Sequence, residues 1–429
     1  MASILFDAVT VDVNLQDKIA SAPSLDIALV LDPDLTGTIT NRTQAFTSLE
    51  DLAATFANTT KIYKCADQHY KQPGHNQTFK VGRVDSGDAN LTASLDALWA
   101  EDKNFFCLLT TSKDETEIET ISDWALGKNI IFGTSVEIDS TMIDSADETD
   151  LASVLSASGN NNTYVHAHHQ AGVDVASVTI AVASGVATVT DAAHTLRVGD
   201  SVTVSGATPS ELNGNVTVAT VPGASSWTYT TTAADGAASG TISYFARYLF
   251  PEAGLQGFQL GKTIGASSWA YKEIAGQTAI PTTLYNSSQV QVLRDKKYIT
   301  YTEPQNNISV TSDGFMVTGR QIVDETVRVW IELNMMTDIF NVQLQNEKIP
   351  YTNPGFELIR RAISTSLGVQ LERGGLNPFS DTEQYRIDMP DALSALPANR
   401  QAGIMDTIEV TARIGSAVLK IDVDVTLIV

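Results

Sequence analysis

Three short stretches carry residue types that bind phosphates or metals in other proteins. The first is Gly257–Thr263, which has the glycines and the lysine of a phosphate-binding loop. That loop needs four residues between its glycines so that backbone amides can surround the phosphates, and here there are three. No convincing strand precedes the stretch. The sequence therefore does not favour a nucleotide site.

The other two stretches carry side chains that ligate metals. His166 and His168 share a face if their segment is a strand, and two such imidazoles can ligate zinc or nickel. Local spacing fixes no third ligand, so a hydrogen-bonded role is favoured. Asp422 and Asp424 likewise share a face of the last segment, where carboxylates also protect a strand edge. We expect no metal and no cofactor.

The sequence has no recognisable nucleophile. It contains neither a Gly-x-Ser-x-Gly elbow nor a cysteine in the local context of a protease nucleophile. The two cysteines, Cys65 and Cys107, are too few for a disulfide framework, and we expect buried, reduced thiols. The sequence therefore predicts that the chain is not an enzyme.

The composition is that of a large, acidic, globular protein. Its 429 residues correspond to about three structural units at roughly 150 residues each. The formal net charge of −23 would repel both nucleic-acid phosphates and anionic lipid headgroups. The start lacks the basic and apolar regions of a signal peptide, and no apolar run reaches the roughly 18 residues of a membrane span. We therefore expect assembly in a cytoplasm, with no nucleic acid and no membrane insertion.

Strands and helices alternate regularly over residues 24–171. The apolar run Ile27–Leu31 reads as a strand buried on both faces, and Ser48 would cap the helix that follows. Further strands are expected at 79–84, 105–110 and 129–133, with helices around 91–99 and 118–124. This alternation indicates an α/β sheet with crossover helices, the first part of an outer domain.

The composition changes at residues 172–245, which we expect to form an inserted all-β domain. The segment has no Lys and one Arg, Arg197, and is dense in Thr, Val, Ala and Gly. Its β-prone runs are separated by turn residues, among them Asn213-Gly214, a hairpin signal. Short strands without intervening helices predict a small sandwich or barrel, tolerated as an insertion if its ends lie close together.

The chain then returns to mixed α/β. We expect residues 246–300 to complete the outer domain, 301–405 to form an inner domain, and 406–429 to form a terminal strand arm. The clearest helix is Glu357–Leu371, which carries an apolar face with Arg360 and Arg361 beside it.

Both ends of the chain are extended segments with one apolar face. Within residues 1–23, Val9, Val11 and Val13 alternate with polar residues. The same alternation ends the chain, at Leu419, Ile421, Val423, Val425 and Leu427. Since a bare apolar strand recruits another strand, the last segment either pairs with Ile408–Arg413 through a hairpin at Ile414–Ser416 or completes the sheet of a neighbouring subunit. Contacts of the second kind that do not close produce helical filaments.

A series of segments in the second half of the chain has a distinctive order. The segments are Ser309–Phe315, Gly319-Arg320, Asp324–Asn334, Ile339–Gln345 and Ile349–Gly355. This series resembles the contractile tail sheath family of phages, in which a strand ending in Asp-Gly is followed by a long helix, a second helix and an Ile-Pro-Tyr-Thr-type turn before another helix. The insertion, through Gly185–Thr190, His194–Val202 and Leu212–Gly214, looks like a small β module of phage virion proteins. This likeness implies an Ig-like domain.

The resemblance implies a structural role in a mixed α/β sheath-type fold. Sheath subunits stack as rings around a tail tube and contract, which drives the tube through the host envelope. The implied partners are further copies of the chain, the tail tube protein, and the baseplate and tail terminator proteins, in a virion tail assembled in the host cytoplasm. The two alternating end segments would be the inter-subunit arms. Arg360 and Arg361 would contact the tube, unless they belong to a solvated helix face.

Two other functions stay open at this point. The chain could be another tail or baseplate component that carries the same β module. It could instead be a surface adhesin that binds glycans through the insertion, with Trp227 and Tyr229 stacking on a sugar. Their alternation with Ser226 and Thr228 is equally typical of a sandwich core strand, which we favour.

Overall fold

The computed structural model describes residues 24–33, 35, 37–58, 60–169, 175–191, 201–223, 225–247, 250–305 and 308–419. These residues fall into two compact units. The smaller unit is Trp330–Ile414, and the larger contains the described residues from 24 to 329 together with 415–419. The boundary expected at residue 301 falls inside a strand of the larger unit, β15.

The larger unit is built on an eight-stranded sheet with the order β16-β15-β6-β5-β4-β1-β3-β2. The six inner strands are parallel, and β2 and β16 are antiparallel edges. The strands are β1 (Ala28–Asp32), β2 (Thr43–Phe46), β3 (Phe79–Arg83), β4 (Cys107–Thr110), β5 (Ile131–Glu137), β6 (Thr163–His168), β15 (Ile299–Gln305) and β16 (Ile308–Thr311). Parallel sheets are covered on both faces, which explains why β1 and β4 are almost continuously apolar.

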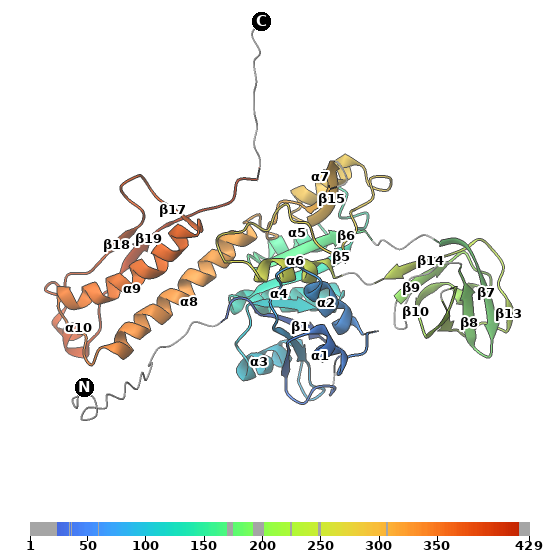
Figure 1. The fold of residues 1–429 in the computed structure, drawn as a ribbon, viewed down its shortest axis with the longest axis horizontal. Helices are drawn as coiled ribbons and strands as arrows, with labels where there is room; N and C mark the ends of the chain where they lie inside the picture. The colour runs from blue at the N-terminus through green and yellow to red at the C-terminus, as the bar shows by residue number, and fades with distance from the viewer. Residues whose placement is uncertain are drawn as a thin grey trace, which may run out of the picture. The chain divides into compact units, whose positions relative to one another are not determined.

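Helices alternate with these strands along the chain, as expected (Figure 1). They are α1 (Leu49–Ala53), α2 (Lys61–Tyr70), α3 (Leu91–Glu101), α4 (Glu115–Gly127), α5 (Leu151–Ala157), α6 (Pro251–Leu260) and α7 (Ser287–Asp295). Phe132 of β5 packs in one core with residues of α3, α4 and α5, whereas the next residue, Gly133, faces Gln256 of α6. The predicted Ser48 cap is present, since its side chain accepts a hydrogen bond from the Asp51 amide at 3.1 Å.

The insertion is all-β in its described residues, as predicted. Its strands are β7 (Val175–Ala183), β8 (Val186–Thr190), β9 (Ser201–Ser205), β10 (Gly214–Thr217), β11 (Thr220–Gly223), β12 (Ser226–Thr230), β13 (Gly236–Ala237) and β14 (Ile242–Arg247), with one short helix, η1 (Ser210–Leu212). The first and last strands pair antiparallel, with Tyr244 opposite Val175, so the two ends of the module lie side by side. This is the geometry that an insertion requires. The Ig-like topology stays a prediction.

The Asn213-Gly214 pair does not make the tight hairpin that its sequence suggests. Strands β9 and β10 do pair antiparallel, but η1 and the flanking turns form the connection between them. Asn213 instead bonds both the backbone amide and the carbonyl of Ala207, at 2.8 and 2.7 Å. The pair therefore closes a longer loop, because Asn can also pair its side chain with nearby backbone.

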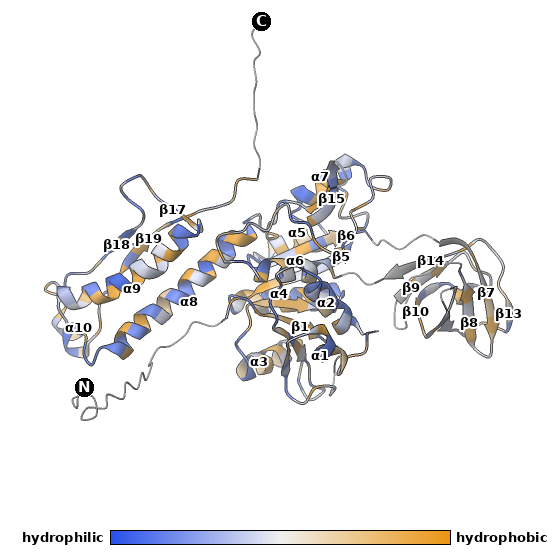
Figure 2. Ribbon diagram, viewed as in Figure 1, coloured by the Kyte–Doolittle hydropathy of each residue, from blue (hydrophilic) through white to orange (hydrophobic). Residues whose placement is uncertain are grey.

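The smaller unit is a helical hairpin with two short strand pairs. Its elements are the C-terminal part of α8 (Ile322–Gln345), α9 (Asn353–Glu372), α10 (Pro397–Ala402), β17 (Leu376–Asn377), β18 (Arg386–Asp388), β19 (Glu409–Thr411) and β20 (Arg413–Ile414). Ile363 and Leu367 of α9 pack with residues of α8 in its core, and Figure 2 shows the apolar residues of both helices. The two helices expected at Asp324–Asn334 and Ile339–Gln345 are one uninterrupted helix, α8.

Candidate assembly site

Most of the predicted arm residues lie outside the described residues. This holds for Val9, Val11 and Val13 at the start, for Asp422 and Asp424, and for the arm positions Ile421, Val423, Val425 and Leu427. Leu419 is described, half-buried, at the end of a segment without secondary structure. The arm roles therefore stay predictions.

The smaller unit carries two open strand pairs. Strand β18 pairs with β19, and β17 pairs with β20, and neither pair has a third strand among the residues that the structure describes. All three residues of β19 and both of β20 are exposed. Isolated two-stranded ribbons are marginally stable in water, and their free edges can accept another strand.

The predicted hairpin through Ile414–Ser416 needs the last segment as its second strand, and residues 420–429 lie outside the described residues, so the hairpin stays a prediction. Ile408–Arg413 contributes β19, whose partner is β18, and Arg413–Ile414 pairs with β17. Residues 415–419 are not a strand. Each of these short strands is therefore paired on one edge in the described part of the chain.

Arg360 and Arg361 lie on the exposed side of α9. Arg360 forms an ion pair with Glu357 at 3.5 Å, and both side chains are 48% exposed. Such an exposed pair contributes little to stability. Both guanidinium groups are therefore accessible for a contact with another protein.

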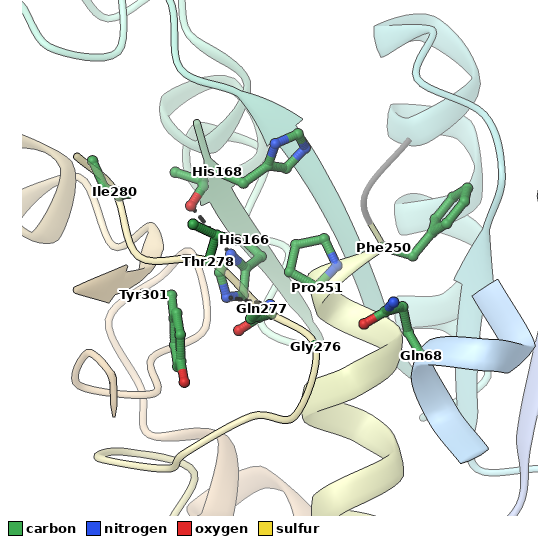
Figure 3. Close-up of a pocket in the computed structure, with 11 residues that line it drawn as sticks. Gln68, His166, His168, Phe250, Pro251, Gly276, Gln277, Thr278, Ile280 and Tyr301 are labelled. Carbon is green, nitrogen blue, oxygen red and sulfur yellow. Dashed lines mark hydrogen bonds between the residues drawn. The ribbon is translucent and has the colours of Figure 1, made fainter. Parts of the chain in front are cut away.

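His166 and His168 both line one small pocket, as a shared strand face predicts (Figure 3). The pocket has a volume of roughly 10 Å³, room for about one water molecule. His166 Nδ1 lies 3.2 Å from Ala167 O, and its Nε2 lies 3.5 Å from Gln277 Nε2. Burial lowers the pKa of His166 to about 3 and holds the pKa of His168 well below its ordinary value, so both rings are neutral at pH 7.

Other candidate chemistry has a structural explanation. In the described ranges no three His, Cys, Asp or Glu side chains gather as a metal site. Cys65 and Cys107 are buried and unpaired by disulfide, as predicted, and burial raises the pKa of both thiols. No helix of the part that is described is both long enough and apolar enough to cross a membrane.

The glycines of Gly257–Thr263 serve helix packing. Gly257 lies inside α6, where a Cβ atom would approach the backbone oxygen of His69, at the end of α2, to 2.6 Å. A Cβ atom at Gly261 would lie even closer to the backbone oxygen of Gly74. The two glycines, four residues apart, therefore let α6 approach the end of α2.

Trp227 and Tyr229 belong to the core of the β module. They are 0% and 1% exposed, and Tyr229 donates a hydrogen bond from its hydroxyl to Leu212 O at 3.0 Å. Two buried rings cannot stack on a sugar. The adhesin hypothesis, which rested on this pair, is therefore wrong in the form stated.

Comparison with known proteins identifies the fold. No family model matches the sequence, and no curated protein matches it. A chain from the contracted helical sheath of the anti-feeding prophage is 12% identical, with a TM-score of 0.57, over 97% of this chain and 97% of that chain. A chain from the contracted sheath complex of an extracellular contractile injection system, PVC, is 11% identical, with a TM-score of 0.54, over 98% of this chain and 97% of that one.

A chain from the contracted baseplate of the anti-feeding prophage matches as well, with 10% identity and a TM-score of 0.60 over 98% of each chain. The protein therefore has, over nearly its whole length, the fold of chains found in contractile sheaths and baseplates. The predicted sheath-type fold is confirmed.

Proposed function

We propose that this chain is a structural subunit of a contractile tail sheath, which polymerises around a tail tube and contracts to drive the tube through an envelope. The observation that carries the proposal is the end-to-end fold match to a helical sheath chain. The open β18–β19 and β17–β20 pairs support it, because a polymer of such subunits needs acceptor edges.

The terminal segments would supply the strands that these edges accept. Residues 419–427 alternate apolar and polar side chains, and so do residues 9–13. A donated strand would complete a ribbon through backbone hydrogen bonds, and its apolar face would cover exposed apolar side chains such as Val410 and Ile414. Because donor and acceptor are different parts of the chain, the contact is heterologous and extends into a helix.

The proposal requires no cofactor and no catalysis by this chain. The work of contraction would come from free energy stored when copies assemble in a metastable packing. The partners would be further copies, the tube protein, and baseplate and terminator proteins, in a tail particle assembled in a host cytoplasm.

Deleting residues 420–429 tests the arm role. The truncated chain should stay folded, because these residues lie beyond every described strand, and it should fail to form tubes under conditions in which the full chain polymerises. Sedimentation and electron microscopy measure this directly. Tubes of normal length from the truncated chain would refute the arm role.

Arg360 and Arg361 are our candidates for the tube contact, because they are exposed basic residues on an acidic chain. Reversing both to Glu should leave self-assembly intact and abolish co-sedimentation with the tube protein. Reversing the exposed Arg386, which pairs with Glu383, is a matched control. Equal binding by all three proteins would remove the pair from the interface.

A baseplate role is the second candidate, because a baseplate chain matches with a TM-score of 0.60. A sheath subunit adds ring upon ring, whereas a baseplate component stops at a defined ring. The length distribution of assemblies formed by the purified chain therefore separates the two functions.

A further inference from the structure

The described end of the C-terminal segment is held by three side chains that contact it mainly through its backbone. The Gln321 side chain donates to Ala417 O at 2.9 Å and accepts from Ala417 N at 3.0 Å. The hydroxyl of Ser416 donates to Asp324 at 2.8 Å, and the hydroxyl of Tyr271 lies 2.7 Å from Leu419 O. Tyr271, Gln321 and Asp324 are called the arm clamp below.

The paired bonds of Gln321 imitate a neighbouring strand. A primary amide presents one donor and one acceptor side by side, as a residue in a β-ladder does. Both backbone groups of Ala417 are therefore satisfied although residues 415–419 are not in a sheet. Such a contact fixes the register of the segment and does not depend on the side chain at position 417.

Tyr271 is itself held in place. Its backbone has φ of +56°, which is costly for a residue with a side chain, and its amide donates to Thr311 O of β16 at 3.1 Å. Its hydroxyl also lies 3.3 Å from Asp313 Oδ1, while Arg294 of α7 makes a two-pronged contact with Asp313, at 2.7 and 3.0 Å. Since a hydroxyl has one hydrogen, the shorter distance assigns that hydrogen to Leu419.

Two of the groups involved come from the segments that carry the family resemblance. Asp313, which supports Tyr271, lies at the end of the strand segment, and Asp324 lies in the first turn of the long helix, which Gln321 directly precedes. Gly314 has φ of +65°, and a Cβ there would lie 2.9 Å from the backbone of Ala270, so glycine is needed for Tyr271 to lie beside Asp313. These residues lie about a hundred positions before residue 417 in the sequence, yet they meet at the start of the arm.

We propose that the arm clamp fixes the point and direction in which residues 420–429 leave the subunit, so that a pull on the arm is delivered to the α/β sheet through α8, β16 and α7. This inference rests on the proposed function, in which the arm pairs with another copy. Because the start of the arm is already fixed, less conformational entropy is lost when the arm binds. The arm clamp also keeps the segment attached to its own sheet when neighbouring copies move.

Hydrogen exchange of the unassembled, full-length chain tests the clamp itself. In Gln321→Ala, exchange at the Ala417 amide should be about tenfold faster, because its acceptor is gone. Gln343→Ala, at an exposed position of α8, is the matched control and should leave that exchange unchanged. Unchanged exchange in Gln321→Ala would overturn the proposal. Gln321→Glu keeps the acceptor for the Ala417 amide and loses the donor to the Ala417 carbonyl. Its exchange rate at Ala417 should therefore lie between those of the wild type and Gln321→Ala.

Assembly tests the consequence. The concentration needed for tube formation should rise about tenfold in Gln321→Ala and in Tyr271→Phe, and stay at the wild-type value in Gln343→Ala. Faster exchange at Ala417 combined with wild-type assembly would overturn the role of the clamp in polymerisation. Exchange is measured without assembly, so a wild-type chain that never forms tubes would contradict the proposed function and leave the exchange result valid.

Discussion

Three histidines of the larger unit are neutral at pH 7, of which His69 and His166 are buried and His168 is half-buried. His69 and His166 are 0% and 1% exposed, and burial lowers their pKa values to about 4 and about 3. The pKa of His168 lies well below its ordinary value for the same reason. An unfolded chain protonates histidine near pH 6.5, so protons bind the unfolded state first.

The free energy of unfolding should therefore fall as the pH drops from about 6.5 toward 4. The stability is fully present above the unfolded pKa and is lost below it, because the folded rings do not take up the proton. Each histidine contributes about 1.4 kcal/mol per pH unit in this window. Between pH 7 and pH 5, the free energy of unfolding should fall by about 2 kcal/mol less in His166→Gln than in the wild type. Denaturant titrations at the two pH values measure this, and equal losses would contradict it.

At the residue scale, the sequence shows which groups exist but not what surrounds them. The shared face of His166 and His168 follows from strand periodicity and was predicted. Their burial depends on Gln277 and Tyr301, which are more than a hundred residues away in the chain. The contact between Gln321 and Ala417 was missed for the same reason, because neither residue carries a local signal.

Close contact between helices distinguishes α6 from the other helices. Gly257 lets it approach the backbone of His69, and Gly254 faces Ile274. The glycines whose spacing resembles a phosphate-binding loop therefore serve the close packing of α6. A methyl group at such a position forces the two helices apart.

Gly257→Ala should destabilise the larger unit by about 1–3 kcal/mol. Gly127→Ala, at the end of α4, is the control: nothing lies within 4 Å of a Cβ there, and the change should be neutral or stabilise by up to about 1 kcal/mol. Thermal unfolding followed by circular dichroism distinguishes them. Equal stability of the two variants would show that α6 and α2 are not in close contact.

The stability of the β module can be tested separately from that of the α/β sheet. Its core contains Trp227 and Tyr229 and is separate from the core around β5. Its first and last strands are paired, so its removal leaves two chain ends close together.

Replacing residues 175–247 with a short Gly-Ser linker should leave the unfolding midpoint of the α/β unit nearly unchanged and should leave polymerisation intact. In the full chain, Trp227→Ala should destabilise the module alone, by about 3–5 kcal/mol. Tryptophan fluorescence and circular dichroism would then show separate transitions. A truncated chain that cannot fold would show that the module is part of the main core.

At the element scale, helices and strands with a strong local hydrophobic pattern could be predicted from the sequence, and those with a weak pattern could not. The continuous apolar run of β1 and the alternation in β8 were predicted. Helix α2 was not, because its buried face is made of Ile62, Cys65, Ala66 and His69, a weak apolar stripe. Helix α8 was expected as two helices because the resemblance implied a long helix followed by a second one. The helix instead continues through Thr337, whose hydroxyl donates to Leu333 O, and Asp338, which accepts a hydrogen bond from Ser366.

At the scale of the whole molecule, two features fit the proposed assembly. Among the described residues, the strand pairs of the smaller unit have no third strand, and Gln321 of the larger unit bonds the backbone of Ala417 just before the segment proposed as an arm. The match to sheath and baseplate chains extends over nearly the full length, so the α/β unit and the helical hairpin both belong to the shared fold.

Electron microscopy of the purified, full-length chain at rising concentration tests the central claim most directly. A sheath subunit that donates its arms to neighbours should form hollow tubes, or stacks of rings, whose length grows with concentration. Dispersed monomers at every concentration and salt condition would contradict the account.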